Sequence, residues 1–190
     1  MIKRCWASDD DPLMLAYHDR EWGVPLYGDA DLFAKLVLDG FQAGLSWRVI
    51  LHKRARFLEA FDGFDAERMA RYDRRKIAQI LRDPGIVRNR QKVAAAIANA
   101  RAYLAFQAAQ GGFSAFLWSF VGGRPRQYRR RRLRDLPARS RESDTMSAAL
   151  VERGFRFVGP TICYAFMQAV GMVNDHLVTC FRHAELGGAR

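Results

Sequence analysis

The 190-residue sequence contains only three cysteines, no unbroken apolar segment of membrane length and no run of alternating apolar and polar residues. The odd set of Cys5, Cys163 and Cys180 argues against a disulfide framework and leaves the thiols for metal binding, core packing or catalysis. Because the alternation that marks half-buried strands is missing, we predict an all-α fold.

Two segments without charge, 102–123 and 157–174, have the length of a membrane span. Both contain glutamine, and they are interrupted by Gly111-Gly112 and Gly159-Pro160 respectively, so we interpret them as buried helices. The amino terminus also lacks the apolar core of a secretion signal. We therefore expect a cytoplasmic protein with no membrane partner.

The residues that are present are typical of a folded protein, since 49% are apolar, 12% aromatic and 27% charged. A chain of this length has room for one domain, and we predict a single domain over 1–190. Apolar periodicity between breaks rich in glycine and proline predicts helices. Their expected ranges are 12–22, 31–43, 47–61, 74–81, 88–110, 113–121, 143–153 and 161–173.

The formal net charge of +11 is concentrated in one segment. Residues 124–141, which we expect to form a basic loop, carry nine arginines and one acid, Asp135, so they contribute +8 and leave +3 for the rest of the chain. Such a segment is either a solvated loop or a surface that binds phosphates. The sequence leaves both interpretations open.

A second basic feature is the turn Asp83-Pro84-Gly85-Ile86-Val87 between two predicted helices. It is typical of a helix-hairpin-helix, here around 74–100, whose backbone N–H groups bind a DNA phosphate without sequence preference. The alternative is an ordinary turn between helices. On the first interpretation, the residues that contact DNA are Gly85, Ile86, Arg88 and Lys92.

Acidic residues are absent between Asp83 and Asp135. A catalytic carboxylate on the helix after the hairpin is thereby excluded. The only lysine in this interval is Lys92, which we expect on the side of the hairpin that faces phosphate. The interval therefore offers neither a general acid nor a lysine nucleophile for strand cleavage.

Aromatic residues are concentrated in the first quarter of the chain, which holds Trp6, Trp22 and Trp47, three of the four tryptophans. Aromatic clusters usually belong to a core. Asp39, however, lies within about 20° of Leu32 around the predicted helix, at the edge of its apolar face. A carboxylate there needs hydrogen-bond donors, which a helix end, an arginine or a bound ligand can provide.

Two Cys/His pairs lie at opposite ends of the chain, Cys5 with His18 and His176 with Cys180. The second pair is spaced i, i+4, so on a helix both side chains share one face. The four side chains together make a tetrahedral Cys₂His₂ set that can bind one zinc ion and join the termini. The competing interpretation is a buried thiol with ordinary surface histidines.

Eight segments form a distinctive set in this order. They are Ala16-Tyr17-His18-Asp19, Glu21-Trp22-Gly23-Val24-Pro25, Gln42-Ala43-Gly44-Leu45-Ser46-Trp47, Gly85-Ile86-Val87-Arg88, Arg153-Gly154-Phe155-Arg156-Phe157-Val158-Gly159, Thr161-Ile162-Cys163-Tyr164, Phe166-Met167-Gln168-Ala169 and Val173-Asn174-Asp175-His176. Together they closely resemble the 3-methyladenine DNA glycosylase I family, over about residues 4–181 and with few gaps.

The resemblance implies an all-α fold of the helix-hairpin-helix DNA glycosylase superfamily, with a zinc site joining the N- and C-termini. It also implies a DNA repair enzyme that excises 3-methyladenine from double-stranded DNA containing alkylated bases, and we expect it to act as a monomer. One structural zinc ion (Zn2+) per chain is implied, with the ligands Cys5, His18, His176 and Cys180. The implied base-binding residues are Tyr17, Trp22, Asp39 and Trp47. Gly44 and Leu45 are implied to enter the gap that a flipped base leaves in the duplex.

The chain departs from the family in three places. Asp39 stands where the family has a glutamate that binds the excised base, and we assign the catalytic role to it. The amino-terminal Cys-Gly-Trp of the family is Cys5-Trp6-Ala7 here. The family is also not particularly basic at 124–141.

The chemistry that the resemblance implies agrees with the absence of acidic residues between Asp83 and Asp135. Methylation at N3 makes the purine cationic, so the base leaves neutral and needs no general acid. Trp47 then stacks on the cationic ring, while Asp39 and Tyr17 hydrogen-bond its edge. We predict a monofunctional glycosylase. The alternatives are a zinc-stapled helix-hairpin-helix nucleic-acid-binding module without catalysis, marked by the change to Asp39, and an RNA binder that uses the arginine segment.

Overall fold

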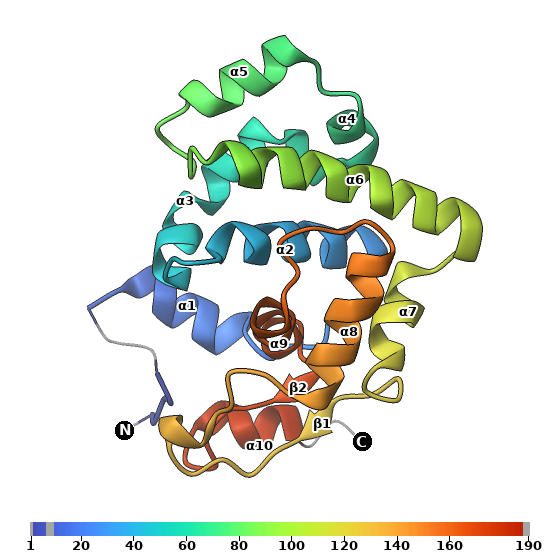
Figure 1. The fold of residues 1–190 in the computed structure, drawn as a ribbon. Coiled ribbons are helices and arrows are strands. Elements are labelled where there is room, and N and C mark those ends of the chain that lie inside the picture. The colour runs from blue at the N-terminus through green and yellow to red at the C-terminus, as the bar shows by residue number, and fades with distance from the viewer. Residues whose placement is uncertain (1, 7–9, 188–190) are drawn as a thin grey trace.

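Helices α2 (Asp29–Gln42) and α9 (Pro160–Ala169) lie at the centre of the computed structural model, which describes residues 2–6 and 10–187 (Figure 1). Long helix α6 (Arg90–Gln110) separates them from α4 (Ala66–Ala70) and α5 (Arg74–Arg82) at one end of the molecule. The remaining helices are α1 (Pro12–Arg20), α3 (Trp47–Ala60), α7 (Phe113–Ser119), α8 (Arg141–Glu152), α10 (Phe181–Gly187) and the 3₁₀ turns η1 (Asp62–Phe64) and η2 (Leu133–Asp135).

The central helix α2 is buried along most of its length, because it packs against helices on several sides. Leu32, Leu36 and Phe41 on this helix are at most 1% exposed. Its first residue, Asp29, accepts hydrogen bonds from the backbone N–H groups of Phe113 and Ser114 at the start of α7. The carboxylate thus caps a second helix and fixes its position relative to α2.

The eight helices predicted from the sequence are all present, with ends that agree to within four residues. Helices α4 and α10 were not predicted, because five and seven residues are too few to show a reliable apolar period. The all-α prediction is correct in its main point. The described residues also contain two strands, β1 (Arg126–Gln127) and β2 (Val173–Asn174), which pair in parallel.

The basic segment is attached to the body of the protein along its first half. Beyond the β1–β2 pairing, the backbone N–H of Val178 donates to the carbonyl oxygen of Arg130 at 2.8 Å. Arg126 and Arg130 are partly buried and pair with Glu142 and Asp175 respectively. Of the two interpretations that the sequence left open, a wholly solvated loop therefore does not describe the part that carries Arg126 and Arg130, while Arg129, Arg131, Arg132 and Arg134 are exposed.

None of the helices within residues 2–6 and 10–187 has both the length and the apolar character that crossing a bilayer requires.

Candidate functional site

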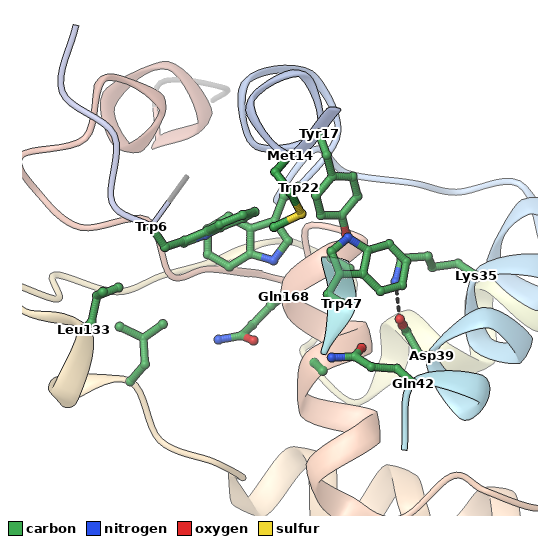
Figure 2. Close-up of a pocket in the computed structure, with 13 residues that line it drawn as sticks. Trp6, Met14, Tyr17, Trp22, Lys35, Asp39, Gln42, Trp47, Leu133 and Gln168 are labelled. Atoms are coloured by element: carbon green, nitrogen blue, oxygen red, sulfur yellow. Dashed lines mark hydrogen bonds and ion pairs between the residues drawn. The ribbon is translucent and has the colours of Figure 1, made fainter. Parts of the chain in front are cut away.

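A cavity of about 320 Å³ is enclosed mainly by residues of α1, α2, α9 and the start of α3 (Figure 2). Its aromatic lining consists of Trp6, Tyr17, Trp22 and Trp47. The Trp6 and Trp22 rings meet edge to face with centroids 5.3 Å apart, and the Tyr17 and Trp47 rings are 5.1 Å apart. Tyr17, Trp22, Asp39 and Trp47, which we predicted to bind the base, all line this cavity, as does Trp6.

Asp39 places a buried carboxylate in this aromatic cavity. The residue is 1% exposed, and its Oδ1 accepts a hydrogen bond from the Lys35 ammonium group one helical turn earlier. The partner is therefore neither an arginine nor a helix end. Burial raises the pKa of Asp39, and the Lys35 charge opposes that rise. Oδ2 of Asp39 and Nε1 of Trp47 are buried without a hydrogen-bond partner among the described residues, so an acceptor and a donor remain for a ligand.

Lys35 is a cavity residue that the sequence analysis missed. Its Nζ atom lies 4.1 Å from the centroid of a Trp47 ring, which is the geometry of a cation–π contact. Figure 2 shows the Lys35 side chain passing over Trp47 to reach Asp39. The i, i+4 spacing of Lys35 and Asp39 was the signal in the sequence, because it places the two side chains next to each other on a helix.

Tyr17 offers a neutral hydroxyl group to the same space. The residue is 4% exposed, and burial, followed by the charge of Asp39, raises the pKa of its phenol well above the usual value. A phenol that stays protonated at neutral pH can donate a hydrogen bond to the edge of a base. The base-binding role of Tyr17 stays a prediction, and it requires such a donor.

Two glutamines, Gln42 and Gln168, complete the polar part of the cavity, and their amide groups point into it in Figure 2. The amide of Gln168 donates to Oδ2 of the buried Asp175 at 2.9 Å. Asp175 also accepts hydrogen bonds from the Tyr164 hydroxyl at 2.7 Å and from Nε of Arg130 at 3.2 Å. The basic segment is thus linked through one carboxylate to a cavity residue, a connection that local sequence patterns do not show.

The turn between α2 and α3 carries the residues predicted to enter the duplex. Gly44 has φ +75°, a backbone conformation that favours glycine, and Leu45 is 40% exposed. The turn is held by Lys92, whose ammonium group donates to the carbonyl oxygens of Phe41 at 2.8 Å and Ala43 at 2.5 Å. The prediction that Lys92 faces phosphate is wrong, because the residue is only 7% exposed and its Nζ satisfies the end of α2.

The predicted hairpin turn lies between α5 and α6, but two of its residues cannot act as expected. The N–H group of Gly85 donates to the Asp83 carboxylate at 2.8 Å, so it is not free for a phosphate. A Cβ atom at Gly85 would collide with the Arg56 side chain, which explains the glycine. Ile86 is 3% exposed and belongs to the core. Arg88, in contrast, is exposed after the turn.

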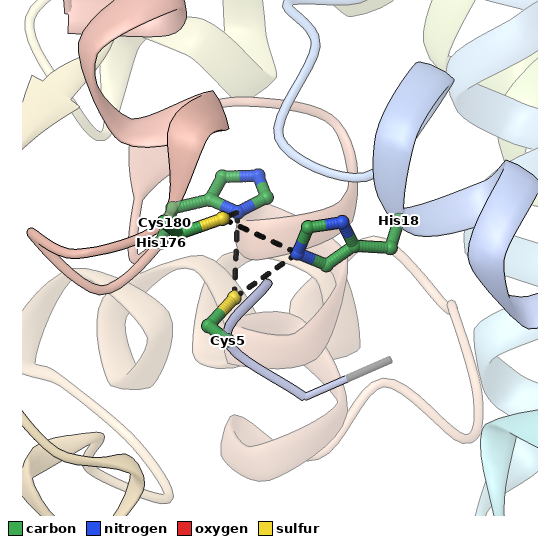
Figure 3. A group of neighbouring side chains, drawn as sticks. All are labelled: Cys5, His18, His176 and Cys180. Carbon is green, nitrogen blue, oxygen red and sulfur yellow. Dashed lines mark hydrogen bonds between the residues drawn. The ribbon is translucent and has the colours of Figure 1, made fainter. Parts of the chain in front are cut away.

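The four predicted metal ligands converge between the two ends of the chain (Figure 3). One ligand atom from each of Cys5, His18, His176 and Cys180 lies within 4.8 Å of all the others. Cys5 Sγ and His18 Nε2 lie 3.2 Å apart. The i, i+4 spacing of His176 and Cys180 had suggested a shared helix. Instead, both residues lie in the segment between β2 and α10. The segment curls so that their ligand atoms are 3.5 Å apart.

The surroundings of this cluster suit a cation. Nδ1 of His18 contacts the Asp19 carboxylate at 2.8 Å and Nε2 of His176 contacts the Trp22 carbonyl at 3.1 Å, so each ring directs its other nitrogen toward the centre. Burial lowers the pKa of His176 to about 4, which keeps it neutral. Burial and the neighbouring Cys180 raise the pKa of Cys5 to about 12, a rise that a bound cation would reverse.

The third cysteine stands apart from this cluster. Cys163 lies on α9, is fully buried, and its Sγ contacts the carbonyl oxygen of Val158 at 3.1 Å. Of the uses that the sequence left open for the thiols, core packing therefore fits Cys163.

Comparison with known proteins gives one consistent result. Residues 6–183 match the methyladenine glycosylase family. The chain is 45% identical to DNA-3-methyladenine glycosylase 1 of Escherichia coli K12 over 179 residues, which cover 94% of this chain and 96% of that protein. A crystal structure of 3-methyladenine DNA glycosylase I superposes with a TM-score of 0.92 at 46% identity, over 94% of this chain and 98% of the other. A variant of such an enzyme in complex with 3-methyladenine superposes with a TM-score of 0.87 at 37% identity, over 90% and 92%.

Proposed function

Since the chain belongs to the methyladenine glycosylase family and is a DNA-3-methyladenine glycosylase, we propose that it flips the damaged nucleotide into the cavity lined by Trp47 and Asp39 and hydrolyses its N-glycosidic bond. The observation that carries this proposal is the pairing of an aromatic face with a buried carboxylate in one cavity. Both attract a cation, and 3-methyladenine in DNA is cationic.

The reaction needs little chemistry from the protein. Water adds to C1′ of the sugar, the bond from C1′ to N9 breaks, and its electron pair goes to the purine and cancels the positive charge. The proton of the water is released to solvent. Because the base leaves neutral, no general acid is required, in agreement with the absence of Asp and Glu from residues 84–134. Trp47, Tyr17 and Asp39 select the base and hold it for cleavage.

Contact with DNA is assigned to two neighbouring surfaces. Leu45, at the exposed turn after α2, fits the role of a wedge that fills the gap left by the flipped base. Arg88 and Arg90, exposed where α6 begins, suit the phosphates of a helix-hairpin-helix contact. Lys92 positions the wedge by holding the end of α2. All cavity residues come from one chain, so a monomer suffices to bind the base.

The Cys5, His18, His176 and Cys180 set fits one structural zinc ion. Two thiols and two histidines with their ring nitrogens directed inward complete a tetrahedron, and no open position for catalysis remains. When bound, the metal would join Cys5, close to Trp6 of the cavity wall, to the carboxyl-terminal segment. This is a stabilising role at a distance from the reacting base.

Release of 3-methyladenine from alkylated duplex DNA tests the function. We expect the wild-type protein to release the free base and to leave an abasic strand. Asp39→Ala should abolish release while nonspecific DNA affinity stays intact, because the carboxylate contacts the base and not the backbone. Asp39→Asn, which keeps the shape but not the charge, is the matched control for the cationic interaction. Binding of DNA by the wild-type protein without any release would instead support a nucleic-acid-binding module without catalysis.

A further inference from the structure

Lys35 occupies the place in the cavity that a cationic base requires. Its ammonium group is bonded to Asp39 and lies 4.1 Å from the centroid of a Trp47 ring. Its side chain is 14% exposed, while that of Asp39 is 1% exposed. The pair is thus shielded from water, and the ammonium group has both an aromatic and a carboxylate partner.

The damaged base needs the same two partners. On the proposed function, its positive charge lies on the face of Trp47 and its edge faces Asp39. Two cations cannot share one aromatic face and one carboxylate at this distance without strong repulsion. Binding of the base at this position therefore requires the ammonium group to leave.

We propose that Lys35 is a resident cation that the cationic base displaces and that returns to expel the neutral base after cleavage, so that Lys35 determines which bases the cavity holds. The proposal rests on the assignment of this cavity to base recognition. It gives Lys35 a role in specificity and product release, without placing it at the bond that breaks.

A second cavity, of about 260 Å³, offers Lys35 an alternative position. Tyr17, Lys35 and Trp47 line both cavities, so the lysine side chain stands in the wall between them. The second cavity is also lined by Glu21, whose carboxylate pairs with Arg54 at 2.5 Å. A lysine that turns away from Asp39 toward this cavity approaches Glu21 and keeps a carboxylate nearby.

The exchange separates charged from neutral bases by electrostatics. A cationic base replaces the ammonium group with another positive charge, so the buried carboxylate of Asp39 stays compensated. A neutral adenine that displaced Lys35 would leave this carboxylate buried without a cation, which is unfavourable. Once the bond from C1′ to N9 has broken, the neutral product, like adenine, leaves the Asp39 carboxylate without a compensating cation. Lys35 then returns to Asp39 and Trp47.

Binding of free 3-methyladenine, the neutral product, measures this competition. Lys35→Met removes the ammonium group and keeps an unbranched side chain over Trp47. We expect the Kd of free 3-methyladenine for this variant to fall by about tenfold or more relative to wild type, because no cation has to be displaced. Steady-state excision should become correspondingly more sensitive to added free base.

Two controls and one alternative test variant separate competition from structural damage. Lys35→Arg keeps the cation and should retain a Kd near that of wild type. Lys76→Met removes a lysine on α5 and should leave the Kd of free base unchanged. Lys35→Gln removes the charge but keeps a hydrogen-bond donor, and it replaces Lys35→Met if the latter does not give a cooperative thermal unfolding transition.

A Kd of free base for Lys35→Met or Lys35→Gln that equals or exceeds the wild-type value overturns the proposal. An equal Kd would mean that Lys35 does not compete with the base, and a higher Kd would make Lys35 a direct ligand of the base. If the Kd of free base falls as far for Lys35→Arg as for Lys35→Met, the proposal is also overturned, because the gain in affinity would then come from repacking and not from the loss of charge. Failure of the proposed function is recognised separately, by a wild-type protein that releases no 3-methyladenine from alkylated DNA.

Discussion

Nε of Arg130 lies 3.2 Å from Oδ1 of Asp175, a carboxylate that is itself 1% exposed. Arg130 belongs to the basic segment, and Asp175 directly precedes the cluster residue His176 and bonds the cavity residue Gln168. The interaction therefore fastens the basic segment to the recognition cavity.

We expect Arg130→Met to destabilise the protein by about 1–3 kcal/mol, because the buried carboxylate of Asp175 is then deprived of its cationic partner while the neutral donors Tyr164 and Gln168 remain. Urea unfolding measures the change. Arg131→Met, an exposed neighbour, is the matched control and should stay within about 0.5 kcal/mol of wild type. Equal destabilisation of both variants would mean that the ion pair with Asp175 contributes nothing.

Replacement of the exposed Arg129, Arg131 and Arg132 by alanine should weaken binding to all duplex DNA alike. The slope of log K against log salt should flatten by up to about one unit for each phosphate that no longer has an arginine beside it. The maximal single-turnover rate of excision should be retained, because these side chains do not line the cavity. A wild-type salt slope in the triple variant would show that the side chains of Arg129, Arg131 and Arg132 have no role in DNA binding.

Freshly purified protein should contain about one zinc ion per chain by elemental analysis. Cys180→Ala should lower the free energy of unfolding by roughly 3 kcal/mol or more, because it removes a ligand of the structural metal. Cys163→Ala is the matched control, since Cys163 is fully buried on α9 and contacts the Val158 carbonyl instead of the cluster. Less than half an equivalent of zinc, or equal destabilisation of both variants, contradicts the assignment.

No covalent protein–DNA adduct should form when lesion-containing DNA is incubated with the protein in borohydride. The Lys35 amine is paired with Asp39 in the free protein and is expected to turn away from the base toward Glu21 when the nucleotide binds, and the Lys92 amine is bonded to two carbonyl oxygens, so neither is placed to attack C1′. Lys35→Met is the control. An adduct in wild type that disappears in this variant would identify Lys35 as a nucleophile and the enzyme as bifunctional.

Acid should weaken the fold partly through Asp62. The Tyr72 hydroxyl donates to its carboxylate at 2.6 Å, and this bond, with help from Lys76, lowers the pKa of Asp62 in the folded state. The resulting stability is present above the unfolded pKa of about 4 and is lost as the pH falls through the lower folded value. Tyr72→Phe should therefore cost about 1 kcal/mol at pH 7 and progressively less as the pH approaches 3. A constant difference across this range would exclude Asp62 as the cause.

The sequence predicted those features that depend on local pattern or on residue type. Long helices such as α2 and α6 show their apolar period, and the metal cluster was found because cysteine and histidine have few structural uses together. The strands β1 and β2 were not predicted, since two residues carry no alternation and the pairing joins segments that are distant in the chain.

Lysine side chains were the main source of error at the site. Lys92 was assigned to phosphate from its position near the hairpin, yet its ammonium group turns inward to carbonyl oxygens of residues about fifty positions earlier in the chain. Lys35 was overlooked although its spacing to Asp39 was visible. A long aliphatic stem lets a lysine place its charge several ångströms from its backbone, so sequence position alone does not locate the charge.

The inward turn of Lys92 also constrains how the protein would lie on a duplex. Lys92 lies near the start of α6, and its ammonium group bonds carbonyl oxygens at the end of α2. The exposed Arg88 and Arg90 beside the start of α6 therefore cannot move independently of Leu45, which follows α2. The protein would then fix the distance between the phosphate bound by these arginines and the base-pair step from which the damaged nucleotide is flipped. Each bound molecule would occupy one register relative to the lesion, and its footprint on DNA would have sharp edges.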